Sequence, residues 1–152
     1  MGQGRARAPR VFARNVNAGE SSMIGYVTLG SNDLERARAF YSALLAEIGG
    51  REVMRLDNGF TMYGTGRGQP GICITKPHNG KAAVPGNGNM VALVLKERRQ
   101  VDAVYAKALA LGGTDEGAPG VRGPEGPQAF YGAYFRDLDG NKLCAFRIGP
   151  AG

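Results

Sequence analysis

The side chains best suited to covalent or acid–base chemistry are few and widely separated. His78 is the single histidine and lies in a segment rich in proline and glycine, without an evident acidic partner. The serines stand in no recognisable nucleophile motif, so a nucleophile with a neighbouring base is not visible. Cys144 would become reactive only if Lys142 or Arg136 lowered its pKa, and a buried, inert thiol is the expected state.

Two aspartates near the C-terminal end form a carboxylate pair that would suit a catalytic role. Asp137 and Asp139 are followed by Gly140 and Asn141, which tolerate positive φ in tight turns. Carboxylates at these positions can accept hydrogen bonds from the N–H groups of the turn. We therefore predict that Asp137, Asp139 and Asn141 are structural rather than catalytic.

The segments that must position these residues alternate between strand and helix patterns. Residues 23–30 predict a strand, followed by a capping residue, Ser31 or Asn32, and a helix over 33–48 that ends at Gly49–Gly50. The predicted buried face of this helix holds Leu34, Ala37, Tyr41, Leu44, Leu45 and Ile48. Short strands are then predicted at 51–56, 60–64 and 71–76.

The same order of patterns returns after a linker over 77–89. A strand over 90–95 precedes a helix over 97–111, which a second Gly-Gly pair closes. The inward residues of this helix are predicted to be Val101, Val104, Tyr105, Ala108 and Leu111. The last strands are predicted near 114–121, at 129–136 and at 142–148. The chain thus predicts an α+β fold of two βαβββ modules, 23–76 and 90–148, in a single domain over 23–148.

Glycine-rich segments interrupt the second half of the chain. Residues 85–89 and 117–126 lack the spacing of a phosphate-binding loop. We expect them to border a ligand site instead.

Composition and charge restrict the class of protein. Hydrophobic residues make up 43% and charged residues 21% of the chain, as in globular domains. The net charge is +6, and part of it lies at the N-terminal end, where the acidic Glu20 is opposed by Arg5, Arg7, Arg10 and Arg14. We interpret residues 1–22 as a flexible basic arm. A transit segment, a nucleic-acid-binding arm and an extension ahead of Met23 are the alternatives.

The remaining residues argue against nucleic acid and membranes as partners. No stripe of Arg and Lys and no aromatic RNA-binding motif is present. The apolar runs are too short to span a bilayer, and no apolar signal core stands near the start. Without a secretion signal, Cys73 and Cys144 are expected to stay reduced. We therefore expect a cytoplasmic protein.

Three segments carry a family resemblance. They are GYVTLGSNDLERARAFYSALL (25–45), GNGNMVALVLKERRQVDAVYAKALALGG (86–113) and FYGAYFRDLDGNKLCAF (130–146). In this order they resemble the vicinal-oxygen-chelate superfamily of glyoxalases, bleomycin-resistance proteins and extradiol dioxygenases. The resemblance implies a homodimer, and modules whose mixed sheets form a concave cup with the helices outside. Strand alternation then places Val27 and Leu29 towards the helices, and Tyr26 and Thr28 in the cup.

The resemblance also implies four metal-ligand positions on cup-facing strands. Metal-dependent members place His or Glu there, whereas this sequence has Tyr26, Cys73, Met90 and Cys144. Divalent ions such as Mg²⁺, Mn²⁺, Fe²⁺ and Ni²⁺ prefer carboxylate oxygen and imidazole nitrogen. Cys73, Met90 and Cys144 could instead hold Cu(I) or Zn²⁺. Because Cys and Met commonly fill interiors, we interpret the set as the lining of a pocket, with no metal and no cofactor.

The expected function is the binding of a small organic molecule in the cup. Aromatic and polarizable side chains would contact a planar ligand, and Arg136 and Lys142 would contact an anion near the rim. The predicted ligand-binding residues are Tyr26, Thr28, Tyr63, Cys73, Met90, Tyr134, Arg136, Lys142, Cys144 and Phe146. One alternative is a superfamily enzyme of the lactoylglutathione lyase or dioxygenase type with an atypical or absent metal site. The other is a non-catalytic dimeric interaction protein.

Overall fold

The computed structural model describes residues 22–152, so the prediction of an arm over 1–22 lies almost wholly outside the described residues. The first half contains β1 (Tyr26–Gly30), α1 (Leu34–Ala46), β2 (Arg51–Arg55), β3 (Thr61–Gly64) and β4 (Gly71–Thr75). The second half contains β5 (Val91–Val94), α2 (Arg98–Ala110), β6 (Thr114–Arg122), β7 (Phe130–Arg136) and β8 (Lys142–Ile148). The predicted α+β tandem of βαβββ modules is confirmed.

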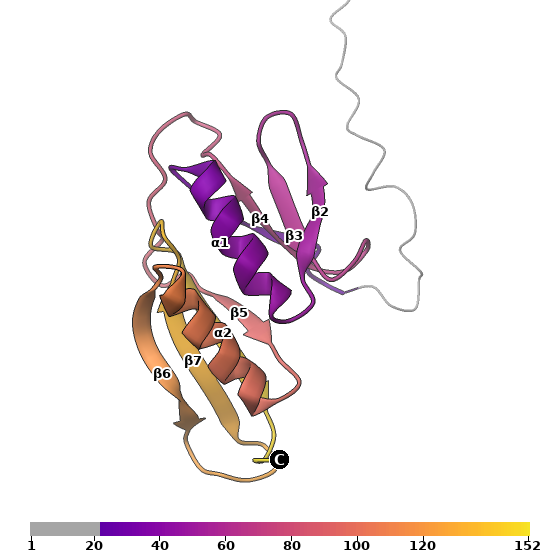
Figure 1. Ribbon diagram of the computed structural model, residues 1–152, viewed down its shortest axis with the longest axis vertical. Helices are drawn as coiled ribbons and strands as arrows, with labels where there is room; N and C mark the ends of the chain where they lie inside the picture. Colours follow the sequence, from indigo (N-terminus) through magenta and orange to yellow (C-terminus); the bar gives the residue numbers. More distant parts are fainter. Residues whose placement is uncertain (1–21) are drawn as a thin grey trace, which may run out of the picture.

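The two modules have the same sheet topology. Their strand orders are β1-β4-β3-β2 and β5-β8-β7-β6. β1 and β4 are parallel, as are β5 and β8, and the other pairs are antiparallel. The modules follow one another along the long axis of the molecule, with both helices on the same side of the sheets (Figure 1). The sheets remain two separate four-stranded sheets and do not close into one.

The core fills the space between helices and sheets. Apolar side chains recur at helical spacing on each helix, and the buried ones are Ala37, Phe40, Tyr41, Leu44 and Leu45 on α1, and Val101, Val104 and Ala108 on α2. They pack against alternate strand residues, among them Ile72, Ile74, Leu143 and Ala145. Burial of each large apolar side chain contributes about 1.5–3 kcal/mol. The predicted helix-facing residues Val27 and Leu29 also pack against this core, which confirms the alternation of β1.

The start of α1 differs from the prediction. Its N-cap is Asp33, whose Oδ1 accepts a hydrogen bond from the Arg36 backbone N–H at 3.1 Å. The backbone N–H of Ser31 donates to the carbonyl of Thr75, so Ser31 still belongs to the β1–β4 ladder. The prediction of Ser31 or Asn32 as the cap was therefore wrong, because the strand hydrogen bonding continues to Ser31.

The turn between β7 and β8 has the predicted structural role. Asp137 Oδ1 accepts hydrogen bonds from the backbone N–H groups of Asp139 and Asn141, both at 2.9 Å. Gly140 has a φ of 88°, in the left-handed region that glycine adopts without a steric penalty. The carboxylate of Asp137 thus holds the turn closed.

The same turn also connects the two modules, a role that the sequence did not indicate. The hydroxyl of Tyr41 on α1 donates to Asp137 Oδ2 at 2.6 Å, and both residues are buried. The Asn141 side-chain amide donates to the carbonyl of Gly30 in β1 at 3.0 Å. We call these two contacts the module joint.

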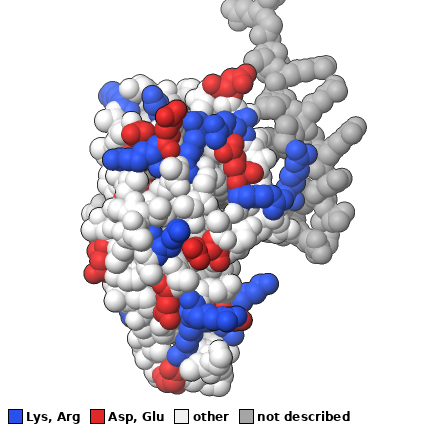
Figure 2. Space-filling model, in the orientation of Figure 1, with Lys and Arg blue, Asp and Glu red and all other residues white. Residues whose placement is uncertain are grey.

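The outer surface gives two further observations. On the face that carries the helices, basic and acidic side chains interleave, and neither sign forms a continuous patch (Figure 2). In the part of the chain that the structure describes, no helix is long and apolar enough to cross a membrane.

Candidate functional site

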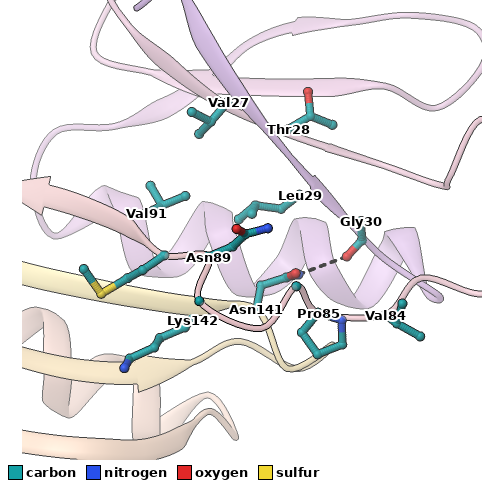
Figure 3. A pocket seen from close by; sticks show the side chains of 13 residues that line it. Val27, Thr28, Leu29, Gly30, Val84, Pro85, Asn89, Val91, Asn141 and Lys142 are labelled. Atoms are coloured by element: carbon teal, nitrogen blue, oxygen red, sulfur yellow. Dashed lines mark hydrogen bonds between the residues drawn. The ribbon is translucent and has the colours of Figure 1, made fainter.

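A cleft lies between the two modules, beside the module joint. It has a volume of about 510 Å³ and is lined by residues 27–30 of β1, by 84–86 and 88–90 of the connecting segment, by Val91 of β5, and by Asn141 and Lys142. The hydrogen bond from Asn141 to Gly30 crosses one end of it (Figure 3). The cleft brings together Thr28, Met90 and Lys142 of the predicted site.

The side of the second sheet that faces away from α2 carries the predicted residues of the second module. Ladder pairs set Tyr134 opposite Cys144 and Gly132 opposite Phe146, and the neighbouring residues Ala133 and Ala145 belong to the core on the helix side. Strand alternation therefore points Tyr134 and Phe146 away from the helices. We call this surface, formed by Arg122, Phe130, Tyr134, Lys142 and Phe146, the open face.

Two cations lie beside one aromatic ring on the open face. The Lys142 Nζ is 5.4 Å from the centroid of the Tyr134 ring, and the Arg122 Cζ is 5.6 Å from it. Both distances are within the range of a cation–π contact. Neither cation forms an ion pair with any carboxylate of residues 22–152. The Lys142 side chain points away from β1, so its charge lies on the open face rather than in the cleft (Figure 3).

Arg136 shares this face but has partners of its own. Its Nε donates to Glu116, with which it forms an ion pair, and its Nη1 donates to the carbonyl of Gly140 at 2.8 Å. Its positive charge is thus compensated by a carboxylate. Of the two cations predicted to contact an anion, only Lys142 has a charge that no carboxylate of residues 22–152 compensates.

The first sheet contributes fewer of the predicted residues than expected. Tyr26 is 46% exposed and contacts Phe60 edge to face, with 6.0 Å between the ring centroids. Thr28 is exposed, and Cys73 is completely buried. These three positions follow the predicted alternation of β1 and β4.

The placement of Tyr63 among these residues was wrong. Its ring is buried on the helix side, and its hydroxyl donates to the carbonyl of Arg38 and accepts a hydrogen bond from Ser42, both on α1. The reason is the register of β3, because Tyr63 pairs with the helix-facing Ile72. The residue of β3 that pairs with Cys73 is Met62.

The four positions at which metal-dependent superfamily members place their ligands do not offer a suitable donor set in this chain. Cys73 and Cys144 are both free and completely buried. Burial raises the pKa of Cys73 to about 12. Burial also raises the pKa of Cys144, against the opposing effects of a hydrogen bond with Tyr134 and the charges of Arg122 and Lys142. A thiol must lose its proton to bind a metal, so these environments work against ligation.

No other residues supply the missing donors. Within residues 22–152, no group of three or more His, Cys, Asp and Glu side chains is arranged to hold a metal ion. Tyr26, Met90 and two protonated thiols do not match the oxygen and nitrogen donors that hard or borderline divalent ions prefer. The residues present therefore do not fit the metal centre of metal-dependent superfamily members.

Two residues of the open face were missed in the sequence. Phe130 has the same parity in β7 as Tyr134, so alternation alone could have identified it. Arg122 ends β6, where register irregularities between Asp115 and Gly120 hide the alternation. The sequence of that strand therefore carried no usable signal for Arg122.

Comparisons with known proteins agree with this architecture. The family model of the Glyoxalase/Bleomycin resistance protein/Dioxygenase superfamily matches residues 23–145. The chain is 37% identical to a glyoxalase/bleomycin resistance protein from Albidiferax ferrireducens T118, over 83% of this chain and 99% of that one, with a TM-score of 0.73. A hypothetical protein of S. aureus is 25% identical over 85% and 94% of the two chains, with a TM-score of 0.63. A superfamily enzyme from Burkholderia phytofirmans PsJN, at 19% identity, covers 82% and 97% with a TM-score of 0.61 and shares the fold. Among curated proteins, none matches the chain.

Proposed function

Because the chain belongs to the glyoxalase/bleomycin resistance protein/dioxygenase superfamily, we propose that it binds a small organic molecule at the cleft and the open face, without a resident metal and without turnover. The observation that carries this proposal is the pair of buried thiols, Cys73 and Cys144, at two of the four positions where metal-dependent members place their ligands. Superfamily isomerases and dioxygenases of the metal-dependent kind need an ion that polarises substrate oxygens. Two completely buried thiols at these positions do not supply the ligands that such an ion needs.

The dimensions of the cleft support a ligand of drug-like size. Its volume of about 510 Å³ lies within the range of small-molecule sites, which is about 300–1,000 Å³. Thr28 and Asn89 contribute polar groups to the lining, and Val27, Leu29 and Met90 contribute apolar surface. Such a mixture gives affinity through apolar burial and orientation through a few hydrogen bonds.

We further propose that the protein works as a homodimer. Apolar side chains remain in contact with solvent at the start of β1, away from the open face: Ile24 and Tyr26 are 50% and 46% exposed. A second copy of the chain would remove such side chains from water. Sedimentation velocity at micromolar concentration tests this, and a single monomeric species would contradict it.

The cytoplasm is the compartment that we propose for this dimer. Both cysteines are free, which suits a reducing environment. Fractionation of cells that express the full chain tests the assignment, and recovery in a membrane or secreted fraction would contradict it.

The proposed absence of a metal can be tested on protein purified without chelator. Elemental analysis should find no stoichiometric Ni, Zn, Mn, Fe or Cu. A stoichiometric ion that is lost in both Cys73→Ser and Cys144→Ser would refute the metal-free proposal. The control is Cys73→Ala, which removes the same sulfur without adding a polar group and should behave as Cys73→Ser does. In parallel, a ligand that raises the melting temperature should be recovered chemically unchanged after prolonged incubation with the protein.

A further inference from the structure

Glycines, which have no Cβ atom, determine the shape of the open face. A Cβ at Gly132 would lie 2.5 Å from Cε1 of Phe130, far inside van der Waals contact. Only glycine therefore lets the Phe130 ring lie down over β7 towards β8. There it stacks on Phe146, with 5.3 Å between the ring centroids and planes 7° apart. The result is a flat aromatic pair across two strands.

Two further glycines allow the Arg122 side chain to lie beside Tyr134. A Cβ at Gly120 would lie 3.0 Å from Nη1 of Arg122, and one at Gly117 would lie 3.3 Å from its Nη2. The Arg122 side chain thus occupies the space that these two glycines leave along β6. Its Nη2 donates to the carbonyl of Ala118 at 2.7 Å, which holds the guanidinium beside the Tyr134 ring.

The charges on this surface are unbalanced. Arg136 is paired with Glu116, but Arg122 and Lys142 have no carboxylate within ion-pair distance among the described residues. Both cations also act on Cys144, below the Tyr134 ring, where they lower its pKa against the effect of burial. Arg122 and Lys142, which both contact the Tyr134 ring, therefore form one positive region.

Positive charge and aromatic surface adjoin each other on this face. Tyr134 is opposite Cys144, and Phe146 follows two residues later along β8. Two residues of a strand span about 6.8 Å. An aromatic ring resting on Phe146 and Phe130 would thus place a carboxylate on that ring within reach of Lys142 and Arg122.

We propose that the open face binds an aromatic carboxylic acid, with the carboxylate at Arg122 and Lys142 and the ring against Phe146 and Phe130. This inference rests on the proposed function and specifies its ligand class. The carboxylate would receive charge-assisted hydrogen bonds from two cations whose opposite charge is otherwise supplied by water and salt. The ring would bury apolar surface in an offset or edge contact with the phenylalanines.

The test uses the full chain, labelled with ¹⁵N, and three matched pairs of compounds. The pairs are benzoate and benzamide, 2-naphthoate and 2-naphthamide, and indole-3-acetate and indole-3-acetamide. Each acid should bind at least about fivefold more tightly than its amide, as expected for about 1 kcal/mol of ionic interaction. Amide shifts should centre on Tyr134, Cys144 and Phe146, and the preference should shrink as salt is added.

Two substitutions localise the effect. Arg122→Gln and Lys142→Gln together should abolish the preference for acids, measured as the ratio of the dissociation constants of each acid and its amide. The matched control is Arg147→Gln, which removes a positive charge from the opposite side of β8 and should keep the preference.

The outcomes separate this inference from the proposed function. If the amides bind as tightly as the acids, or the double variant keeps the preference, the ligand class is wrong and small-molecule binding stands. If shifts are confined to residues 84–91, the cleft is the site and the open face is not. If no compound shifts a resonance of the open face, this inference is refuted, and the proposed function is then decided by whether any other compound raises the melting temperature of the protein.

Discussion

The contribution of the module joint to the stability of the domain can be tested with a single substitution. Tyr41→Phe removes one hydroxyl from a buried ring and leaves its packing on α1 intact. The hydroxyl is the donor of the 2.6 Å hydrogen bond to Asp137. We expect this single atom to contribute measurably to the stability of the whole domain, because it lies between the modules.

The expected loss of stability depends on the hydrogen-bond donors that the Asp137 carboxylate retains in Tyr41→Phe. Its Oδ1 retains the backbone N–H groups of Asp139 and Asn141, and its Oδ2 retains the Asn141 side-chain amide at 2.9 Å. The variant therefore loses one of four donors to a buried carboxylate. A hydrogen bond to a charged group contributes about 1.5–3 kcal/mol, so we expect a loss of about 2 kcal/mol. At about 4 °C per kcal/mol, the melting temperature should fall by about 8 °C.

Equilibrium unfolding in urea, followed by circular dichroism, measures this loss. The control is Tyr131→Phe, which removes a hydroxyl that donates to Asp102 at the same distance of 2.6 Å but at the surface. The control should lose less than about 0.5 kcal/mol, because water replaces an exposed partner. Equal losses in the two variants, or a loss below 0.5 kcal/mol in Tyr41→Phe, would show that the joint does not stabilise the fold.

Three further predictions concern single groups. Burial, and then the charge of Asp137, raises the pKa of Tyr41 well above its ordinary value of 10.0. The stabilisation from neutral Tyr41 is therefore complete below pH 10.0 and is lost as the pH rises towards the raised pKa, at up to about 1.4 kcal/mol per pH unit. Above pH 10.0, the free energy of unfolding measured in urea should decrease more steeply with pH for the wild type than for Tyr41→Phe. Equal slopes for the two proteins would contradict this. Because burial raises the pKa of Cys73 to about 12 and also raises that of Cys144, neither thiol should react with Ellman's reagent at pH 8 until guanidinium chloride is added, and rapid native labelling would contradict the burial. Gly132→Ala should displace the Phe130 ring and abolish the nuclear Overhauser contacts of the stacked pair, with a stability loss under about 1 kcal/mol, and an unchanged stack would show that the glycine is not required.

Much of the fold could be predicted because the local signals agree with one another. Strands and helices were expected at 142–148, 71–76 and 97–111, and were found at Lys142–Ile148, Gly71–Thr75 and Arg98–Ala110. Apolar periodicity and the Gly-Gly pairs define these elements without tertiary information. The errors came where tertiary contacts decide, as at Ser31, which the β1–β4 ladder draws away from the helix cap.

The candidate site was less predictable, for two physical reasons. Parity places a residue on a face only when its cross-strand partner is known, and Tyr63 was assigned to the wrong face because its pairing with the helix-facing Ile72 is not visible in the sequence. The charge state of a surface depends on pairing across strands, which sequence separation conceals. Arg136 and Lys142 looked equivalent in the sequence, yet Glu116 compensates only Arg136.

The module joint also has a consequence for the order of events during folding. Its two hydrogen bonds, Tyr41 to Asp137 and Asn141 to Gly30, connect residues 96 and 111 positions apart, in a chain of 152. Each module can form its own helix and hairpins through nearer contacts, but the joint must wait until both ends of the domain have been made. Contacts that form after the rate-limiting step slow unfolding and leave the rate of folding nearly unchanged. The joint would then slow unfolding without accelerating folding. Tyr41→Phe should increase the rate constant of unfolding and leave the rate constant of folding nearly unchanged.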